Sequence, residues 1–446
     1  MEHSAHGTAN APPAPGHRPV TRLYAWSVFA LTFGLMLSDY LSRQVITPIF
    51  PFLKAEWTLS DTQLGALVSV VALIVGVCSL PIALLADRWG RVKSITAMAG
   101  LWGIATIACG LATGYTQMLV ARALVGLGEA GYGSAGGAIL MHVFPPERRS
   151  AIMGAFLAAS LFGSVLGVVA GGVISAQYGW RAAFIGVGAG GLLLVVLYPL
   201  IVRDYQTVAL LKKDAQAGSS ARRMRIGEII RELFVPRSAL FTYLGSGFAM
   251  FIIGVINAWI PSYLTRYYGL APDKAALQAG IVVLVAGVGM IVCGWGVDRL
   301  SRLHPRNKLR VPAAYAVVTF ALLATAFALP PGNLQLWLIL AGVFVAGGHS
   351  GAAGAVISDV THPGLRATAF AVVVLGNNLL GFAPGPVLIG ALSDALGLKT
   401  AMTIAPAVCL LAATFFLLGA RHYERERGRF EEPADLDAHA PAPVRH

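Results

Sequence analysis

Four charged residues lie in otherwise apolar stretches of the chain, and their types and spacing could support proton exchange and anion binding. Asp39 and Arg43 are four residues apart, and Arg122 and Glu129 are seven apart, so each pair would share one face of a helix. A carboxylate in an apolar environment can take up a proton, and a guanidinium group can hold an anion. We therefore predict that Glu129, and secondarily Asp39, exchanges a proton. Arg43 and Arg122 are expected to contact a substrate.

The composition indicates what kind of protein must position these charges. The chain has 446 residues, of which 56% are hydrophobic and 12% are charged. Soluble proteins carry about 25% charged residues, so this chain has too few to cover a water-facing surface. A soluble protein is therefore excluded. The four cysteines lie in apolar runs, which excludes a disulfide scaffold: Cys78, Cys109, Cys293 and Cys409.

Twelve predominantly apolar runs are long enough to cross a membrane. About 20 helical residues span a hydrocarbon core of about 30 Å, and the runs are continuous rather than alternating, which favours helices over a barrel. The sequence predicts an all-α integral membrane protein with twelve transmembrane helices. Their expected ranges are 23–50, 62–85, 94–113, 115–143, 150–176, 180–202, 238–265, 275–297, 309–330, 333–358, 365–393 and 398–420.

The segments around these runs divide the chain into two halves. We expect a disordered cytoplasmic tail at 1–20, an N-terminal six-helix bundle at 21–202, a cytoplasmic linker at 203–237, a C-terminal six-helix bundle at 238–420 and a second cytoplasmic tail at 421–446. Lys and Arg are concentrated in the loops after the even-numbered helices. Because cytoplasmic loops attract these residues, both termini are expected inside. The net charge of +12 then requires no nucleic-acid partner.

A repeated loop motif indicates that the two halves are related. The sequence D-R-W-G-R begins at Asp87 after the second predicted helix, and D-R-L-S-R begins at Asp298 after the eighth. This recurrence predicts two pseudo-symmetric bundles in parallel arrangement. A carboxylate in such a loop can accept hydrogen bonds from the N-terminus of a facing helix, forming a latch in one conformation. The residues assigned to this cytoplasmic gate are Asp87, Arg88, Arg91, Asp298 and Arg299.

The depths of the four buried charges suggest how they pair. Counting 1.5 Å per residue places Asp39 and Arg122 at similar heights, which predicts a cross-helix ion pair, with Glu129 nearer the middle. A purely structural ion pair is the alternative. The repeat argues against it, because the C-terminal counterpart of Arg122 falls near Leu340. That of Glu129 falls near Gly347, so the second half packs without these charges.

Twelve helices, a basic central linker and the two D-R loops resemble the major facilitator superfamily of secondary transporters, over roughly residues 22–420. The segment containing Arg122, Gly126 and Glu129 is similar to the spinster-like branch, which carries lipids. It also resembles the R-x-x-x-G-x-x-E helix of the organic anion:cation symporters, which carry sugar acids. The resemblance implies that Arg122 and Glu129 serve substrate binding and proton coupling, with two bundles rocking about a midplane site.

The first helix departs from the N-Y-x-D-R pattern that these branches share. Arg43 matches the arginine, but Ser42 stands in place of the acid and Asp39 in place of the asparagine. This leaves open whether Asp39 takes the acid's role from one turn away.

Two glycine-rich motifs have more than one interpretation. Gly163, Gly167 and Gly171 in the fifth helix match most of the superfamily's antiporter motif, and helix packing explains them equally well. The G-x-G-x-x-G sequence that begins at Gly126 fits a dinucleotide site, but no strand precedes it. We therefore expect no cofactor at these glycines.

Polar and aromatic residues in other helices are candidates for the wall of a substrate cavity. For His349, whose side chain could titrate near neutral pH, a structural hydrogen bond is the favoured role. These further substrate-contact candidates are Tyr132, Asn257, Trp259, Tyr263, His349, Asn377 and Asn378.

The sequence contains no phosphate-binding G-x-x-x-x-G-K-[ST] loop and no metal-ligand spacing, so we expect no cofactor, no metal and no enzymatic activity. The leading hypothesis is a monomeric, proton-coupled transporter in the plasma (inner) membrane. Its substrate would be a small anionic or zwitterionic amphiphile or an organic acid. A drug or lipid antiporter and a transporter-like sensor without net flux are the alternatives. Substrate identity and transport direction do not follow from the residues.

Overall fold

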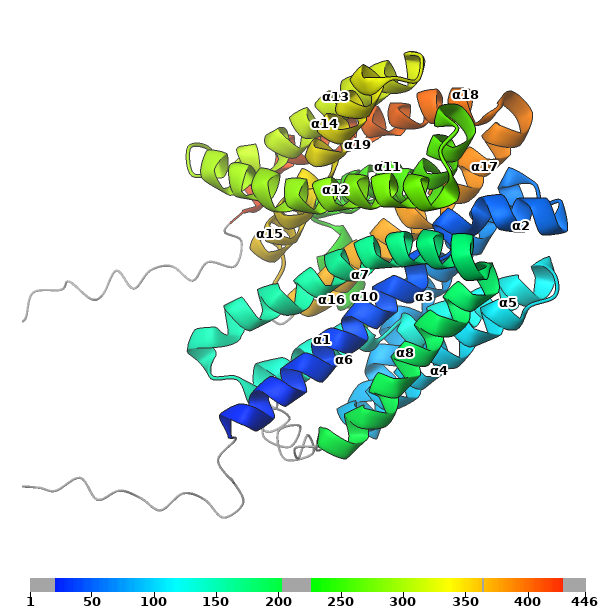
Figure 1. Cartoon of the computed structure of the whole chain (residues 1–446). Coiled ribbons are helices and arrows are strands. Elements are labelled where there is room, and N and C mark those ends of the chain that lie inside the picture. Colours follow the sequence, from blue (N-terminus) through cyan, green and yellow to red (C-terminus); the bar gives the residue numbers. More distant parts are fainter. Residues whose placement is uncertain (1–20, 203–225, 363–364, 428–446) are drawn as a thin grey trace, which may run out of the picture.

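The structure, a computed structural model, describes residues 21–202, 226–362 and 365–427, and every regular element within them is helical. The helices form two bundles that lie beside each other (Figure 1). The predicted tail at 1–20, most of the tail at 421–446 and the first part of the linker fall outside the described residues.

The N-terminal bundle contains six long helical segments and a short helix that joins the first two. In chain order the elements are α1 (Arg22–Gln44), η1 (Thr47–Ile49), α2 (Phe50–Trp57), α3 (Asp61–Trp89), α4 (Arg91–Leu111), α5 (Tyr115–Glu129), α6 (Tyr132–Val143), η2 (Pro146–Arg148), α7 (Arg149–Tyr178) and α8 (Trp180–Ile201).

The C-terminal bundle repeats this plan, with more breaks inside its helices. After the short helix α10 (Ile226–Phe234), its elements are α11 (Arg237–Tyr268), α12 (Pro272–Ser301), α13 (Asn307–Ala328), α14 (Asn333–Ala346), η4 (Gly347–His349), α15 (Ser350–Val360), α16 (Arg366–Gly376), η6 (Asn377–Phe382), α17 (Pro384–Leu396), α18 (Leu398–Ile404), η7 (Ala405–Ala407) and α19 (Val408–Glu426).

The twelve predicted helices are confirmed as twelve helical segments, several of them broken. In the described part of the chain, ten are long and apolar enough to cross a membrane by length and composition. The two segments that fall short are α1 and the pair α5–α6. These segments carry Asp39, Arg43, Arg122 and Glu129, and a break after Glu129 limits α5 to 15 residues.

Glycines at matching positions turn the chain in the two halves. Gly179 connects α7 to α8 with φ of 85°, and Gly397 connects α17 to α18 with φ of 82°. A side chain with a Cβ rarely adopts this left-handed region, so glycine is favoured at both turns. The shared geometry supports the predicted repeat at the level of the backbone.

Glycines also let α7 pack closely on α1. A Cβ at Gly163, Gly167 or Gly171 would lie 2.5–2.7 Å from a carbonyl oxygen of α1 or of the residue that follows it. Real Cβ atoms do not approach oxygens this closely. This spacing accounts for the glycine run in the fifth helix by packing, as in other membrane helices.

The two bundles touch mainly at one end of the molecule. We call this the junction end; it is where α3 begins and α17 ends, and the tail end is where α1 begins and α19 ends. In Figure 1 the bundles approach each other on the right, near α2 and α17, and spread apart toward the left. A Cβ at Gly65 would lie 2.3 Å from the carbonyl oxygen of Pro386, and one at Gly390 would lie 2.4 Å from that of Asp61.

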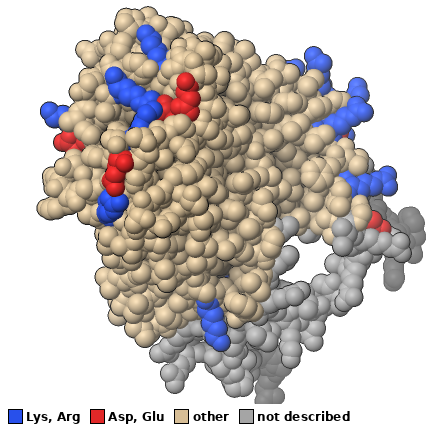
Figure 2. Space-filling model, turned by 90° about the vertical axis from the view of Figure 1, so that its right-hand side faces the viewer, with Lys and Arg blue, Asp and Glu red and all other residues tan. Residues whose placement is uncertain are grey.

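The surface fits a membrane environment. On the face in Figure 2, most charged side chains lie toward two opposite edges, and a broad area between them carries few. Large apolar side chains are exposed on many helices, including Leu193 at 63% and Ile291 at 66%. In water such surface would be unfavourable, whereas lipid chains cover it without cost.

Candidate functional site

Asp39, Arg43 and Glu129 meet inside the N-terminal bundle, where α1 passes α5. The Nη2 atom of Arg43 lies 2.8 Å from Oε2 of Glu129 and 4.0 Å from Oδ1 of Asp39. The side chain of Glu129 is fully buried, that of Asp39 is 6% exposed and that of Arg43 is 22% exposed. Two carboxyl groups thus share one guanidinium group, and Arg43 is the member of the trio whose side chain has the largest exposed fraction.

Arg122 lies beside this trio but makes a different set of contacts. Its Nε donates to the carbonyl oxygen of Leu67 at 3.1 Å, and its Nη atoms donate to the carbonyl oxygens of Ser42 and Arg43 at 3.0 and 3.1 Å. The residue is fully buried. It ties the last turns of α1 to α3 and α5, and it fixes the backbone from which the Arg43 side chain extends.

The predicted ion pair between Asp39 and Arg122 is wrong, since Arg122 donates to backbone carbonyls and Arg43 takes the carboxylates. Depth alone could not distinguish the two arginines. The orientation of α1 about its axis is what brings Arg43 to the Glu129 carboxylate. The formal charges of the two acids and two arginines cancel when both acids are ionised, as the sequence predicted.

Three of the aromatic or imidazole candidates lie within a bundle. The Tyr132 hydroxyl donates to the carbonyl oxygen of Thr32 at 2.6 Å. Tyr263 accepts from Nε2 of Gln335 at 3.0 Å. His349 Nδ1 contacts the carbonyl oxygen of Ala346 at 3.0 Å. Their local contacts are those of side chains that organise a bundle.

The remaining candidates lie on the helices of the C-terminal bundle that approach α3 or η1. Trp259 donates to the carbonyl oxygen of Pro386 at 3.0 Å and packs on Phe50 of the other bundle. Asn377 accepts from Ser246 at 2.7 Å. Asn378 is buried, and its Cβ lies 3.0 Å from where a Cβ of Gly76 would be. Asn257 is half-buried on α11.

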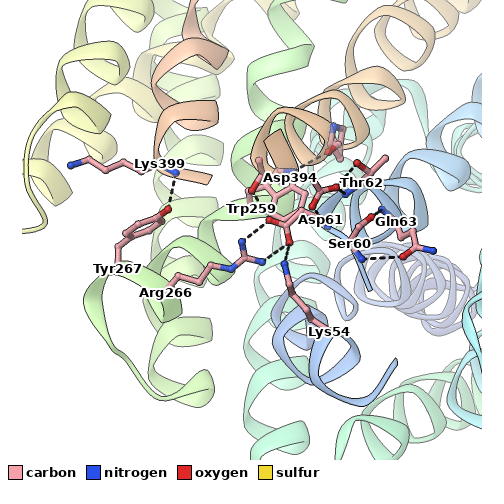
Figure 3. Close-up of polar contacts among 12 residues, drawn as sticks. Lys54, Ser60, Asp61, Thr62, Gln63, Trp259, Arg266, Tyr267, Asp394 and Lys399 are labelled. Carbon is pink, nitrogen blue, oxygen red and sulfur yellow. Dashed lines mark hydrogen bonds and ion pairs between the residues drawn. The ribbon is translucent and has the colours of Figure 1, made fainter. Parts of the chain in front are cut away.

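A second polar cluster, not predicted from the sequence, joins the bundles at the junction end (Figure 3). Asp61, at the start of α3, receives both Nη atoms of Arg266 on α11 at 2.6 and 2.7 Å. Lys54 on α2 and Ser393 on α17 each donate to the same carboxylate at 2.5 Å. Arg266 and Ser393 belong to the opposite bundle, so the buried Asp61 side chain connects four elements across the interface.

Asp394 completes this cluster by capping α3 from the other bundle. Its carboxylate accepts from the backbone N–H groups of Asp61 and Thr62 at 2.7 and 2.8 Å, and from the Thr62 hydroxyl at 2.6 Å. A carboxylate at a helix N-terminus is favourable because free N–H groups and the helix dipole both attract it. In the described residues, the polar contacts between the bundles gather here.

Two further observations concern metal binding and an ion pair outside the cluster. Among the described residues, no group of three His, Cys, Asp or Glu side chains is arranged to hold a metal ion. Outside the cluster, Glu56 on α2 accepts from Arg181 at 2.8 Å and from Trp180 at 2.6 Å. These hydrogen bonds hold the pKa of Glu56 below its ordinary value.

Comparison with known families identifies the fold. Residues 32–383, more than half of the chain, match the family model of the Major Facilitator Superfamily. The chain belongs to the Major Facilitator Superfamily. This membership confirms the predicted fold and the prediction of a membrane transporter rather than an enzyme.

Relatives within the superfamily have several stated activities. An "MFS-type efflux pump" of Mycolicibacterium smegmatis is 26% identical over 411 residues, covering 91% of this chain and 93% of that protein. A "Probable L-galactonate transporter" of Escherichia coli is 29% identical over 289 residues, covering 64% of this chain and 63% of that protein. The crystal structure of a bacterial homologue of the human lysosomal transporter Spinster, inward-facing and unoccupied, matches with a TM-score of 0.81 at 22% identity. That match covers 93% of this chain and 100% of the other.

The expected superfamily gate lies at the tail end. Asp298 and Arg299 are exposed at the end of α12, and the Arg299 guanidinium lies over the Trp295 ring. Arg91 begins α4. The side chains of Asp87 and Arg88 fall outside the described part of the structure. The gate role of these residues stays a prediction.

Proposed function

We propose that the protein is a proton-coupled transporter that moves a small organic anion across the membrane by alternating access. The observation that carries this proposal is the position of the Arg43 guanidinium between the carboxyl groups of Asp39 and Glu129, inside a membrane bundle. A group that binds a buried carboxylate can also bind the carboxylate of a substrate. The Arg43 side chain, 22% exposed, is the most exposed of the three, which supports such an exchange of partners.

The charge balance of the cluster links proton binding to anion binding. Protonation of Glu129 removes the carboxylate that lies 2.8 Å from Arg43. One uncompensated positive charge is left in a low-dielectric site, and it favours a substrate anion. The proton and the anion therefore bind together and cross in the same direction, which is symport. The relative named as an L-galactonate transporter supports a carboxylic acid as the substrate class.

A proton/cation antiporter is the second candidate, supported by the relative named as an efflux pump. A cationic substrate would compete with Arg43 and with protons for the carboxylates of Asp39 and Glu129. Substrate and proton would then exclude each other and cross in opposite directions. The sign of the coupling thus separates the two candidates.

In the proposed orientation, the protein lies in the plasma (inner) membrane with its tail end in the cytoplasm. Basic loops at that end support it, because cytoplasmic loops are enriched in Lys and Arg. With this orientation, the contacts of Asp61 with Arg266 and Asp394 would close the outer side, and we infer an inward-facing conformation of a monomer. Substrate reaches Arg43 from the cytoplasm in this state.

Uptake into proteoliposomes tests the proposal directly. Purified protein is reconstituted, and a panel of sugar acids, aromatic acids and organic cations is offered with and without a pH gradient. We expect an inward-directed proton gradient to drive accumulation of an anion by the wild type. Glu129→Gln should abolish this response while still allowing exchange of the anion at equal concentrations, because the neutral side chain imitates the protonated state.

Glu56→Gln is the matched control, since Glu56 also pairs with an arginine but lies away from the cluster. It should retain coupled uptake. Undiminished coupling in Glu129→Gln would overturn the assignment of the proton site. Accumulation of a cation against a proton gradient would replace symport by the antiport alternative, and binding without any flux would indicate a sensor.

A further inference from the structure

An apolar groove runs along the C-terminal bundle, between α11, the η6–α17 segment and the start of the last helical segment. Its volume is about 780 Å³, which lies in the range of pockets that enclose small ligands, about 300–1,000 Å³. Its lining residues include Phe248, Phe251, Leu380, Leu388, Leu392 and Ile404. The side chains of all thirteen lining residues are apolar, so they offer no hydrogen bond or charge to a polar ligand.

The groove lies at the depth of the membrane. Its walls belong to the spans Arg237–Tyr268, Thr368–Leu396 and Leu398–Glu426. The side chains of Leu388, Ile404 and Leu379 are 51%, 44% and 37% exposed, so its rim faces outward. An apolar cavity of this kind does not favour water. Hydrocarbon is the solvent at this depth, which makes an acyl chain the chemically matched occupant.

The length of the groove is somewhat greater than the thickness of one leaflet. From Leu379 to Leu392 the chain advances thirteen residues, or about 20 Å at 1.5 Å per residue. One leaflet contributes about half of a hydrocarbon core of about 30 Å. A single chain, entering from the junction end, would therefore follow the groove from Leu392 toward the membrane centre.

A π-helical turn forms one wall of this groove. Within η6, the N–H of Ala383 donates to the carbonyl oxygen of Asn378 at 2.8 Å, five residues earlier, where an α-helix would use a four-residue step. Such turns are rare and often found at functional sites. Leu379 and Leu380 of this turn line the groove.

The other face of the same turn packs on α11 and on the N-terminal bundle. A Cβ at Gly381 would lie 2.6 Å from Cβ of Met250. Asn377 accepts a hydrogen bond from Ser246, and Asn378 abuts Gly76 of α3. A ligand in the groove therefore touches the turn that helps to position the bundles.

We propose that this groove binds one acyl chain of a membrane phospholipid, and that the bound chain holds η6 in its π-helical form. The proposal does not depend on the transported substrate. It rests on three features together: apolar walls at membrane depth, a length that reaches from the junction end past the membrane centre, and a π-helical turn in one wall. Loss of the chain should loosen η6 and leave the Asp39–Arg43–Glu129 cluster unchanged.

Retention of phospholipid by the purified protein tests the proposal. The full-length protein is reconstituted with 1-palmitoyl-2-oleoyl phosphatidylglycerol, extracted in mild detergent and measured by native mass spectrometry. We expect the wild type to retain one phospholipid. Ala391→Trp, which fills the groove, should reduce the retained fraction at least about fivefold, which corresponds to about 1 kcal/mol at 25 °C. Leu410→Trp is the matched control on an exposed α19 position outside the groove, and it should behave as the wild type.

Amide hydrogen exchange supplies the second readout. Peptides covering 377–388 should exchange faster in Ala391→Trp and in the delipidated wild type, whereas the α1 peptides should not change. Leu388→Ser, at the exposed rim, provides a milder variant if the tryptophan prevents folding. Equal retention in the wild type, Ala391→Trp and Leu388→Ser would overturn the proposal. So would displacement of the phospholipid by an equimolar transported single-chain amphiphile, which would assign the groove to substrate. Failure of the uptake experiment would leave this result untouched.

Discussion

Arg122 has a buried charge that the structure satisfies without a carboxylate. Its guanidinium donates to three backbone carbonyl oxygens, two of them at the end of α1. The sequence predicts Arg122 as a substrate ligand, on the same grounds as Arg43. The contacts favour a division of roles, in which Arg122 positions α1 and Arg43 meets the substrate.

Substitution of each arginine by glutamine separates these roles. Hydrogen bonds to charged groups contribute about 1.5–3 kcal/mol each, so Arg122→Gln should lower the free energy of unfolding by about 3 kcal/mol. Arg43→Gln should also cost stability, because it leaves the buried Glu129 carboxylate without its partner, but it should abolish anion binding, which Arg122→Gln should retain. Thermal unfolding in detergent measures the first effect, and binding of the transported anion measures the second. Unchanged stability of Arg122→Gln together with lost binding would instead make Arg122 a ligand.

At this scale the sequence predicted the members of the cluster but not their partners. Asp39, Arg43 and Glu129 stand out because charges are rare in apolar runs. Their pairing depends on the rotation of α1 and on carbonyl groups that every sequence contains. Neither is visible in a residue pattern. Asp61 was overlooked because it sits at a helix start, where a capping residue is ordinary.

At the scale of elements, the capping of α3 by Asp394 is a latch across the bundle interface. The sequence predicted this kind of contact, a carboxylate on a facing helix N-terminus, but placed it at the cytoplasmic loops that begin at Asp87 and Asp298. The structure has it at the opposite end, beside the ion pair of Asp61 with Arg266. Under the proposed alternating access, these contacts close one side and must break when that side opens.

Asp394→Asn should favour opening of the junction end. The amide keeps the size of the side chain but loses the charge that interacts with the α3 N-terminus, an effect of about 1 kcal/mol or about fivefold in population. Double electron–electron resonance measures the population of the open junction end. The spin labels are placed at Leu111 and Leu334, which are exposed residues of opposite bundles at the junction end. In Asp394→Asn, the population with a longer distance between the two labels should increase. Leu193→Asn on the exposed face of α8 is the control, and an unchanged distance distribution in Asp394→Asn would contradict the latch.

Helix positions were predictable, whereas their interruptions were not. Apolar run length located all twelve segments, because only hydrophobic runs of about 20 residues cross a bilayer. The breaks after Glu129 and at Asn377–Phe382 carry no such signal. A π turn inserts a residue without changing hydropathy, and its stability depends on contacts outside its own helix, here with α11, α3 and the proposed acyl chain.

At the scale of the whole molecule, the two bundles close on each other through small residues. Glycines of α3, α7, α12 and α17 allow backbones to meet without intervening side chains. The contact between α7 and α12 includes Gly280, where a Cβ would lie 2.6 Å from Cγ2 of Val169. The internal repeat and the distribution of basic residues predicted two bundles, but not the conformation, which depends on contacts between distant segments.

A disulfide across this contact should lock the junction end. In Val169→Cys/Gly280→Cys the Cβ atoms would be about 4 Å apart, within the range of natural disulfides. Oxidation should reduce transport about tenfold or more, because crossing requires both conformations, and a reductant should restore it. Anion binding from the tail end should persist. Each single cysteine variant is the control, and full transport by the oxidised pair would show that the α7–α12 contact does not need to open.

The shared guanidinium of Arg43 also has an electrical consequence. Under the proposed exchange of partners, each monovalent anion that replaces the Glu129 carboxylate at Arg43 arrives with one proton on that carboxylate. The loaded and empty cluster then carry the same total charge. The cycle would move no net current for a monovalent acid, so the membrane voltage would neither drive nor oppose it, and accumulation would follow the pH difference alone. A divalent acid carried with one proton would move one negative charge per cycle and would respond to voltage.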